Sequence, residues 1–169
     1  MSNRTLRGNV EVFLAYPEAF ANAATPTAAE LNSAVYVHKI SCAVDDDFTL
    51  NLTSSDTDDS RSICDVAKVS TPTFDKYEGT LPIFRDEDVT ATGVFNLAFN
   101  LLKAKGIRYW VGVRVGLPQG TAFAAGQIVS LFDFETDYPG DIADATSPMR
   151  LEGRLKPQGT ALVEYEVAA

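Results

Sequence analysis

The chain has 169 residues, 46% of them hydrophobic, and its formal net charge is −9. This length is enough for one domain with a core of its own. The negative charge argues against a nucleic-acid-binding protein, which needs clustered lysine and arginine side chains. No run of about 18 apolar residues predicts a transmembrane helix, and the short apolar run at 12–16 does not make a signal peptide.

The charges are unevenly distributed along the chain. Residues 41–90 carry twelve acidic and four basic side chains, whereas residues 91–132 carry four basic and no acidic ones. Opposite charges on two surfaces of one chain let copies of that chain attract each other. The other interpretation is that both sets of charges are only solvated, and the sequence leaves both open.

The first part of the chain predicts two β-strands. In residues 10–16 the apolar side chains alternate with their neighbours, which indicates a strand that ends before Pro17. Residues 35–40 predict a second strand, and it contains His38, the one histidine of the chain. A histidine inside a strand is better explained as a structural or surface residue than as a catalytic one.

A short helix is expected between these two strands. Thr27 is followed three residues later by Glu30, which is the spacing of a capping box. Alternatively, Thr25 caps the helix and Pro26 takes its first position, where proline is tolerated. Either pattern predicts one or two helical turns.

The region after the second strand is the least regular. Residues 48–52 and 77–85 alternate like strands, and Pro82 indicates that the later one is an edge strand or carries a bulge. Residues 63–69 predict a further strand. Between them, residues 53–62 contain no apolar side chain, so they predict an exposed loop.

The centre of the chain predicts one longer helix that leads directly into a strand. Residues 93–105 have apolar side chains at helical spacing, and Gly106 is placed to end the helix. The acidic residues 86–88 are expected to cap its approach. Residues 107–115 then alternate with a period of two, which predicts a strand with one buried face.

Three more strands are expected after this point, each followed or preceded by a polar turn. The predicted strands are 128–134, 149–155 and 161–167, and the predicted turns are 117–120, 137–140 and 156–159. Proline and glycine stand in these turns at positions that suit them.

These elements predict a mainly β protein, an antiparallel β-sandwich or barrel with one packed helix at about 93–105 and a long loop. Residues 1–169 show no internal repeat and no linker, so a single domain is expected. In the strand at 128–134 the sequence leaves two alternatives open, because either Phe132 and Phe134 or Leu131 faces inward. The residues expected in the core are Leu101, Val111, Val113, Phe132 and Phe134.

No catalytic constellation, cofactor motif or metal-ligand spacing occurs in the sequence, so we do not expect an enzyme. The acidic cluster at 56–59 departs from a calcium-binding loop, because Ser60 and Arg61 follow where the EF-hand pattern needs glycine. Cys42 and Cys64 are expected to be reduced, partly buried thiols, although the sequence leaves open whether they pair.

Several short patterns are familiar from one protein family. They are CD at 64–65, TP at 71–72, YEGTLPIFRD at 77–86, VFNL at 94–97, RYWVGVR at 108–114 and LKPQG at 155–159. In these patterns the chain resembles the major tail protein, also called tail tube protein, of bacteriophages with long non-contractile tails. The resemblance covers most of the chain from about residue 10.

The resemblance implies a β-sandwich with one helix and terminal arms, whose copies form hexameric rings that stack into a tube. Strands of neighbouring subunits would join into an inner barrel, through which DNA passes without sequence-specific binding. The implied partners are further copies of the chain, the tape measure protein inside the tube and the tail terminator at its end. The implied location is the virion tail, after assembly in the host cytoplasm. The alternative is another virion subunit, such as a tail terminator, neck or capsid decoration protein.

In this family a long loop between strands reaches a neighbouring ring, and the loop at 53–62 is the best candidate for that role. The wider candidate region is 41–80. The expected self-assembly residues are Asp56, Asp58, Asp59 and Arg61. The carboxylates of the three aspartates would meet cations of another subunit, and the nearest cationic block in sequence is Lys103, Lys105, Arg108 and Arg114.

Overall fold

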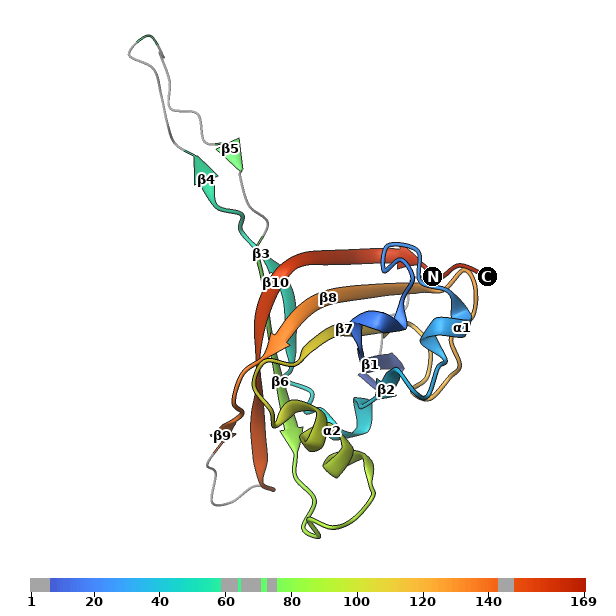
Figure 1. The fold of residues 1–169 in the computed structure, drawn as a ribbon, viewed down its shortest axis with the longest axis vertical. Coiled ribbons are helices and arrows are strands. Elements are labelled where there is room, and N and C mark those ends of the chain that lie inside the picture. Colours follow the sequence, from blue (N-terminus) through green and yellow to red (C-terminus); the bar gives the residue numbers. More distant parts are fainter. Residues whose placement is uncertain (1–6, 59–63, 65–70, 73–75, 143–147) are drawn as a thin grey trace.

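A computed structural model describes residues 7–58, 64, 71–72, 76–142 and 148–169. Its strands form one curved antiparallel sheet of eight strands and a separate two-stranded pair. Figure 1 shows that the sheet curves around helix α2 (Val94–Leu102), while the two-stranded pair projects away from the body as an arm. The mainly β fold expected from the sequence is confirmed.

The strand order of the large sheet sets the arrangement of the whole molecule. Along the sheet lie β2 (Val37–Lys39), β1 (Val10–Ala15), β7 (Arg108–Val115), β8 (Ile128–Thr136), β10 (Arg150–Glu166), β6 (Lys76–Phe84) and β3 (Thr49–Thr53), with β9 (Gly140–Ile142) paired to β10. The arm consists of β4 (Thr57–Asp58) and β5 (Thr71–Pro72). Three short 3₁₀ helices lie at Arg7–Asn9, Pro17–Ala19 and Ser41–Ala43.

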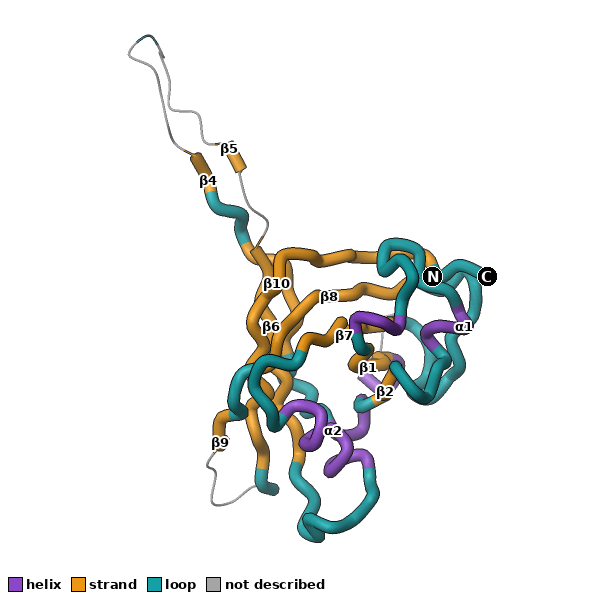
Figure 2. Tube along the Cα trace, viewed as in Figure 1, coloured by secondary structure: helices purple, strands orange, loops and turns teal. Residues whose placement is uncertain are grey.

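Strand β10 is the corner of the sheet. Its residues 150–154 pair with β6, and from Leu155 onward it pairs with β8. The turn expected at 156–159 is therefore wrong, because the chain continues as one bent strand (Figures 1 and 2). At the bend, Pro157 pairs with Phe134 of β8 and Ala161 pairs with Phe132. Residues 158–160 of β10 therefore bulge opposite a single residue of β8, Asp133. Gly159 permits the bulge with a φ of 102°.

Strand β6 and the start of helix α2 differ from what the sequence predicts. β6 is not an edge strand, because β10 and β3 flank it, and the carbonyl of Pro82 accepts the N–H of Asp45 at 2.8 Å. The acidic residues before α2 do not cap it, since its N-cap is Gly93. Instead, the Asn96 amide donates to the carbonyl of Asp88 at 2.8 Å, which ties that loop to the helix.

Of the two helices, the longer one is shorter than the sequence predicts, and the short one fits the one or two turns expected. Helix α2 spans Val94–Leu102, ending before Gly106, whose φ of 83° places it in the following turn. Leu97 is one of the apolar side chains at helical spacing, but it is exposed. Helix α1 spans Ala28–Leu31, and its predicted capping box is confirmed with Thr27 as the N-cap, so the alternative with Thr25 is wrong.

The core lies on both faces of the sheet. One cluster packs between the sheet and α2, and a second packs on the opposite face beneath α1. Strand β7 therefore has two buried faces rather than the one expected, because Tyr109 faces the first cluster and Gly112 contacts Phe13 of the second. Of the predicted core residues, Leu101, Val111, Phe132 and Phe134 are buried, Val113 is half-buried, and Leu131 is buried as well.

Candidate functional site

The arm carries the described part of the predicted self-assembly loop. Asp56 forms an ion pair with Lys76, and both side chains are about half exposed. Asp58 lies in β4, opposite Thr71 of β5. The loop is thus partly a strand pair rather than irregular, although its described residues lie outside the core as expected. Asp59 and Arg61 lie outside the described residues, as does most of the strand predicted at 63–69.

The cationic block proposed as a partner for the arm is divided between the inside and the outside of the protein. Arg114 is buried, and Arg108 Nε donates to Asp133 Oδ1 of the same chain at 2.8 Å. Lys103 and Lys105 are exposed beyond the end of α2. Of the four residues of the cationic block, only these two lysines are exposed and have no acidic partner among the contacts within the described ranges.

The arrangement of β1 and β7 places two opposite charges side by side inside the protein. Glu11 and Arg114 are cross-strand neighbours, and each residue is 1% exposed. Arg114 Nη2 lies 3.8 Å from Glu11 Oε2. Burial lowers the pKa of the Arg114 guanidinium, and the charge of Glu11 opposes this change. Sequence alternation placed Arg114 on a polar face, so this pair was missed.

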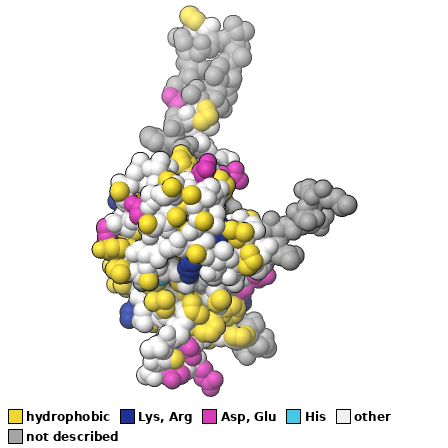
Figure 3. Space-filling view, turned by 90° about the vertical axis from the view of Figure 1, so that its right-hand side faces the viewer, with side chains coloured by type: hydrophobic (Ala, Val, Ile, Leu, Met, Phe, Trp, Pro, Cys, Tyr) yellow, Lys and Arg dark blue, Asp and Glu magenta, His cyan; other side chains and the backbone are white. Residues whose placement is uncertain are grey.

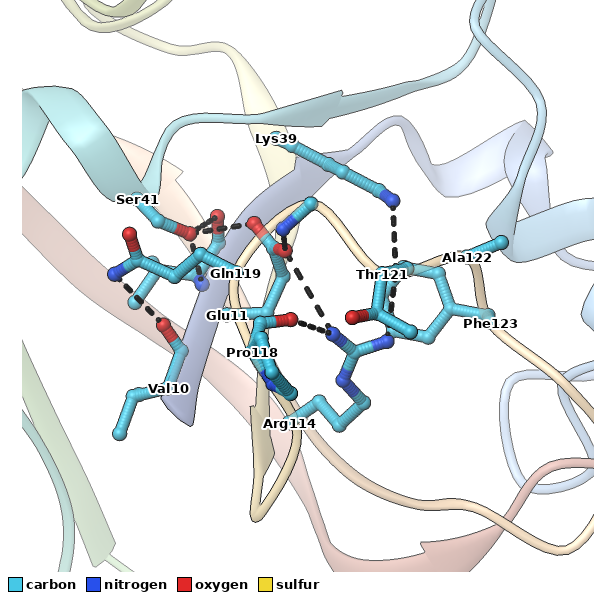
Figure 4. A network of polar contacts seen from close by, with 12 residues as sticks. Val10, Glu11, Lys39, Ser41, Arg114, Pro118, Gln119, Thr121, Ala122 and Phe123 are labelled. Carbon is cyan, nitrogen blue, oxygen red and sulfur yellow. Dashed lines mark hydrogen bonds and ion pairs between the residues drawn. The ribbon is translucent and has the colours of Figure 1, made fainter. Parts of the chain in front are cut away.

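The loop between β7 and β8 surrounds this charge pair (Figure 4). Arg114 Nη1 donates to the carbonyl of Thr121 at 2.9 Å, and Nη2 donates to the carbonyl of Pro118 at 3.1 Å. The backbone N–H of Gly120 donates to the Glu11 carboxylate. The loop backbone therefore binds both Nη atoms of Arg114 and the Glu11 carboxylate, while Arg114 Nε has no hydrogen-bond partner among the described residues. The two charges in turn fix the conformation of the loop.

The same network closes the outer edge of β1 where β2 does not cover it. Ser41 Oγ donates to Glu11 Oε1 at 2.6 Å and accepts the N–H of Val12 at 2.8 Å. The Gln119 amide donates to the carbonyl of Val10 at 3.1 Å. These side chains take the place of a neighbouring strand, which is one way in which proteins protect a sheet edge.

Other edges of the sheet stay open. Within the described ranges, no strand pairs with the outer side of β2. The carboxy-terminal half of β10 pairs with β8 on one side only, because its contact with β6 ends at Arg154. The open edges thus lie at opposite ends of the strand series from β2 to β10. Unpaired N–H and C=O groups of this kind are templates for pairing with another chain.

A groove lies between β3 and the uncovered end of the β7–β8–β10 surface. It has a volume of 540 Å³, and a second hollow of 360 Å³ continues it, sharing Val113 and Ser130. Four exposed hydrophobic side chains line the two hollows, namely Leu52, Val115, Ile128 and Val163. Exposed apolar side chains gathered in one concave surface indicate an interaction site.

The described residues contain few of the side-chain groups that a catalytic or metal site needs. The His38 ring lies edge-on to Tyr16 at 5.8 Å, and burial lowers the pKa of His38. Among the described residues, no group of three His, Cys, Asp or Glu side chains could hold a metal ion. Cys42 and Cys64 are both exposed, so the expectation of partly buried thiols is wrong. No helix in these ranges is long and apolar enough to cross a membrane.

Comparison with known protein families identifies the family of the chain. A model of a family described as phage tail tube protein matches residues 1–169, which is the full length of the chain. The match covers the sheet, the buried charge pair and the arm alike. No curated protein matches the chain.

Proposed function

Because the chain belongs to the phage tail tube protein family, we propose that its copies close into hexameric rings and that these rings stack into the tube through which DNA passes. The protein is a structural component of the virion tail and not an enzyme. Residues 1–169 would form one tail-tube domain, assembled in the host cytoplasm.

The open edges of the sheet support ring formation most directly. β2 and the carboxy-terminal half of β10 lie at opposite ends of one strand series, and each has an unpaired side within the described ranges. A contact between two different surfaces of one chain is head-to-tail, and it closes into a ring when the rotation between copies allows it. Closure would join these two edges of neighbouring copies, so that neither stays exposed.

The charge of the chain supports passage of DNA without specific binding. A net charge of −9 repels phosphate, which lets a nucleic acid slide along a surface instead of adhering to it. Figure 3 shows acidic side chains at the pole opposite the arm and also beside the base of the arm. The tape measure protein inside the tube and the tail terminator at its end would be the further partners.

Electron microscopy of the purified chain tests this proposal. We expect hollow tubes in negative stain, built from rings of six subunits with a regular axial repeat. Single rings that never stack would favour the alternative, a tail terminator, neck or capsid decoration subunit. A chain that stays monomeric at every protein concentration, with or without a tail extract to start assembly, would contradict both.

A further inference from the structure

The groove beside β3 is the unfinished end of a buried surface. Along β7 and β8, alternate side chains on one face enter the core under α2, among them Val111 and Phe132. The same face continues to Val115 and Ile128, where no element of the described chain covers it, and these side chains are 56% and 46% exposed. The core surface therefore extends past its own cover, and an apolar group from outside would complete it.

An apolar protrusion lies beside β2, which is the end of the sheet away from β3. Val35 and Tyr36 form the corner that leads into β2, and they are 71% and 42% exposed. This corner is not a loose loop, because the carbonyl of Tyr36 accepts the N–H of Tyr16 at 3.0 Å. It presents two apolar side chains from a backbone held against β1, which keeps the entropy cost of docking low.

The charges around the two surfaces are complementary. Glu78 lines the groove and Glu164 lines its continuation, whereas the described lining residues of both hollows include no lysine or arginine. Near the corner, residues 31–40 contain Lys39 and no acidic residue. Lys39 Nζ donates one hydrogen bond to the carbonyl of Thr121, and an ammonium group has two further donors.

We propose that the groove takes the Val35–Tyr36 corner of a second copy of this chain, with Lys39 of that copy facing the glutamates of the rim. This contact rests on the proposed self-assembly and names the surfaces that carry it. Groove and corner are different surfaces that share no lining residue, so the contact is head-to-tail and repeats from copy to copy. A seated neighbour lies beside the arm, because the arm rises on the same side of the body as β10 (Figure 1).

Because the contact is head-to-tail, it can be tested with a mixture of two variants, which is more specific than the loss of assembly in one variant. A corner variant, Val35→Asp, and a groove variant, Val115→Asp, each place a carboxylate in the apolar contact. Both positions are largely exposed in the free chain, so each variant should fold and melt like the wild-type protein. Each should raise the critical concentration for assembly about tenfold or more, which corresponds to about 1.4 kcal/mol.

A mixture of the two variants has one intact contact left. The corner variant keeps its groove, and the groove variant keeps its corner, so an equimolar mixture should form a heterodimer that grows no further. Light scattering after size-exclusion chromatography measures this mass directly. The matched control is Val89→Asp, because Val89 is a similarly exposed valine in the loop before α2 that lines neither hollow, and its substitution should leave assembly unchanged.

Two results would overturn the inference and spare the proposed function. One is wild-type assembly by Val35→Asp or by Val115→Asp. The other is a mixture that stays monomeric although each variant is folded and unassembled. If the wild-type chain itself never forms rings or tubes, the proposed function fails and the inference fails with it.

Discussion

The Tyr77 hydroxyl of β6 accepts the backbone N–H of Gly159 in β10 at 2.9 Å. The N–H groups of Gln158 and Thr160 converge on the same oxygen, at 3.0 and 3.1 Å. The hydroxyl proton goes to the carbonyl of Asp133. One side chain thus satisfies the polar backbone groups that the bulge in β10 removes from the ladder with β8, and it holds the corner of the sheet.

Removing this hydroxyl should therefore destabilise the fold with little change in packing. Tyr77→Phe leaves buried N–H groups without an acceptor, and each such group costs about 1–3 kcal/mol. We expect the urea midpoint of unfolding to fall accordingly. Tyr138→Phe is the control, because Tyr138 is exposed and its substitution should stay within about 0.5 kcal/mol. Equal midpoints for the two variants would show that water replaces the hydroxyl at the corner.

The corner of β10 also shows where sequence reasoning stops. Periodicity located every strand of the large sheet except the short β9, because alternation of side chains is a local property of the chain, and it missed the two strands of the arm. The same local patterns wrongly predicted a turn at Lys156-Pro-Gln-Gly159, since these residue types favour turns. What keeps the strand continuous is Tyr77, which lies far away in the sequence and could not be placed there from spacing alone.

The buried charge pair was missed for a related reason. Alternation assigns a charged residue in a strand to the solvent face, but loops and α1 cover that face of the sheet around β1 and β7. The available signal was the presence of opposite charges, Glu11 and Arg114, in the middle of two strongly apolar strands. It becomes decisive only once the pairing register is known, because that register makes the two residues direct neighbours.

Breaking this pair from one side should cost more than removing it whole. Glu11→Gln leaves Arg114 buried without a countercharge, and loss of one partner of a buried pair costs about 3–5 kcal/mol. Arg114→Met should be comparably damaging, while the double variant should lose clearly less than the sum. Urea unfolding of all four proteins measures this coupling. Additive losses would mean that Glu11 and Arg114 act through the loop backbone and not through each other.

Helix α2 supplies a matched pair of leucines for testing the core. Leu101 packs in the cluster beneath the helix, whereas Leu97 is 38% exposed on the same helix. Leu101→Ala should lower the unfolding free energy by about 2–5 kcal/mol. Leu97→Ala should cost far less, because it leaves no cavity. The thermal midpoints of the two variants give the comparison, and an unchanged midpoint for Leu101→Ala would contradict the packing of α2 on the sheet.

Acid should weaken the tie between the start of β10 and the segment before β3. Arg150 Nη1 donates to Asp45 Oδ2 at 2.6 Å, which holds the pKa of Asp45 below its ordinary value, although partial burial opposes this. Asp47 lies 3.8 Å from the same guanidinium nitrogen. A lowered folded-state pKa contributes stability above the unfolded-state pKa of about 4 and loses it as the pH falls through the folded value.

The wild-type chain should accordingly be more stable than Asp45→Asn at pH 6, and the difference should shrink as the pH falls below about 4. Urea midpoints measured across this range provide the curve. Asp47→Asn is the control, because its carboxylate is mostly exposed and more distant from Arg150. A difference between wild type and Asp45→Asn that does not vary with pH would show that the ion pair is not its source.

The arm can be removed at a point where the sheet closes naturally. Thr53 and Lys76 are paired in register at the ends of β3 and β6, so a two-residue Asn-Gly turn can replace residues 54–75. The exposed ion pair between Asp56 and Lys76 is lost, which costs little. We expect a soluble variant with the wild-type melting temperature that no longer forms tubes, because the arm would work in assembly and not in folding.

A second variant tests the contribution of the arm's carboxylates to assembly without changing the length of the arm. Asp56→Asn with Asp58→Asn should shorten tubes at low salt, and raised salt should shorten wild-type tubes in the same way, since the Debye length falls to about 3 Å at 1 M. The control removes two carboxylates elsewhere, by Glu87→Gln with Asp88→Asn in the exposed loop before α2. If the variant without residues 54–75 builds tubes of normal length and salt tolerance, the arm is a solvated extension and the rings stack through another surface.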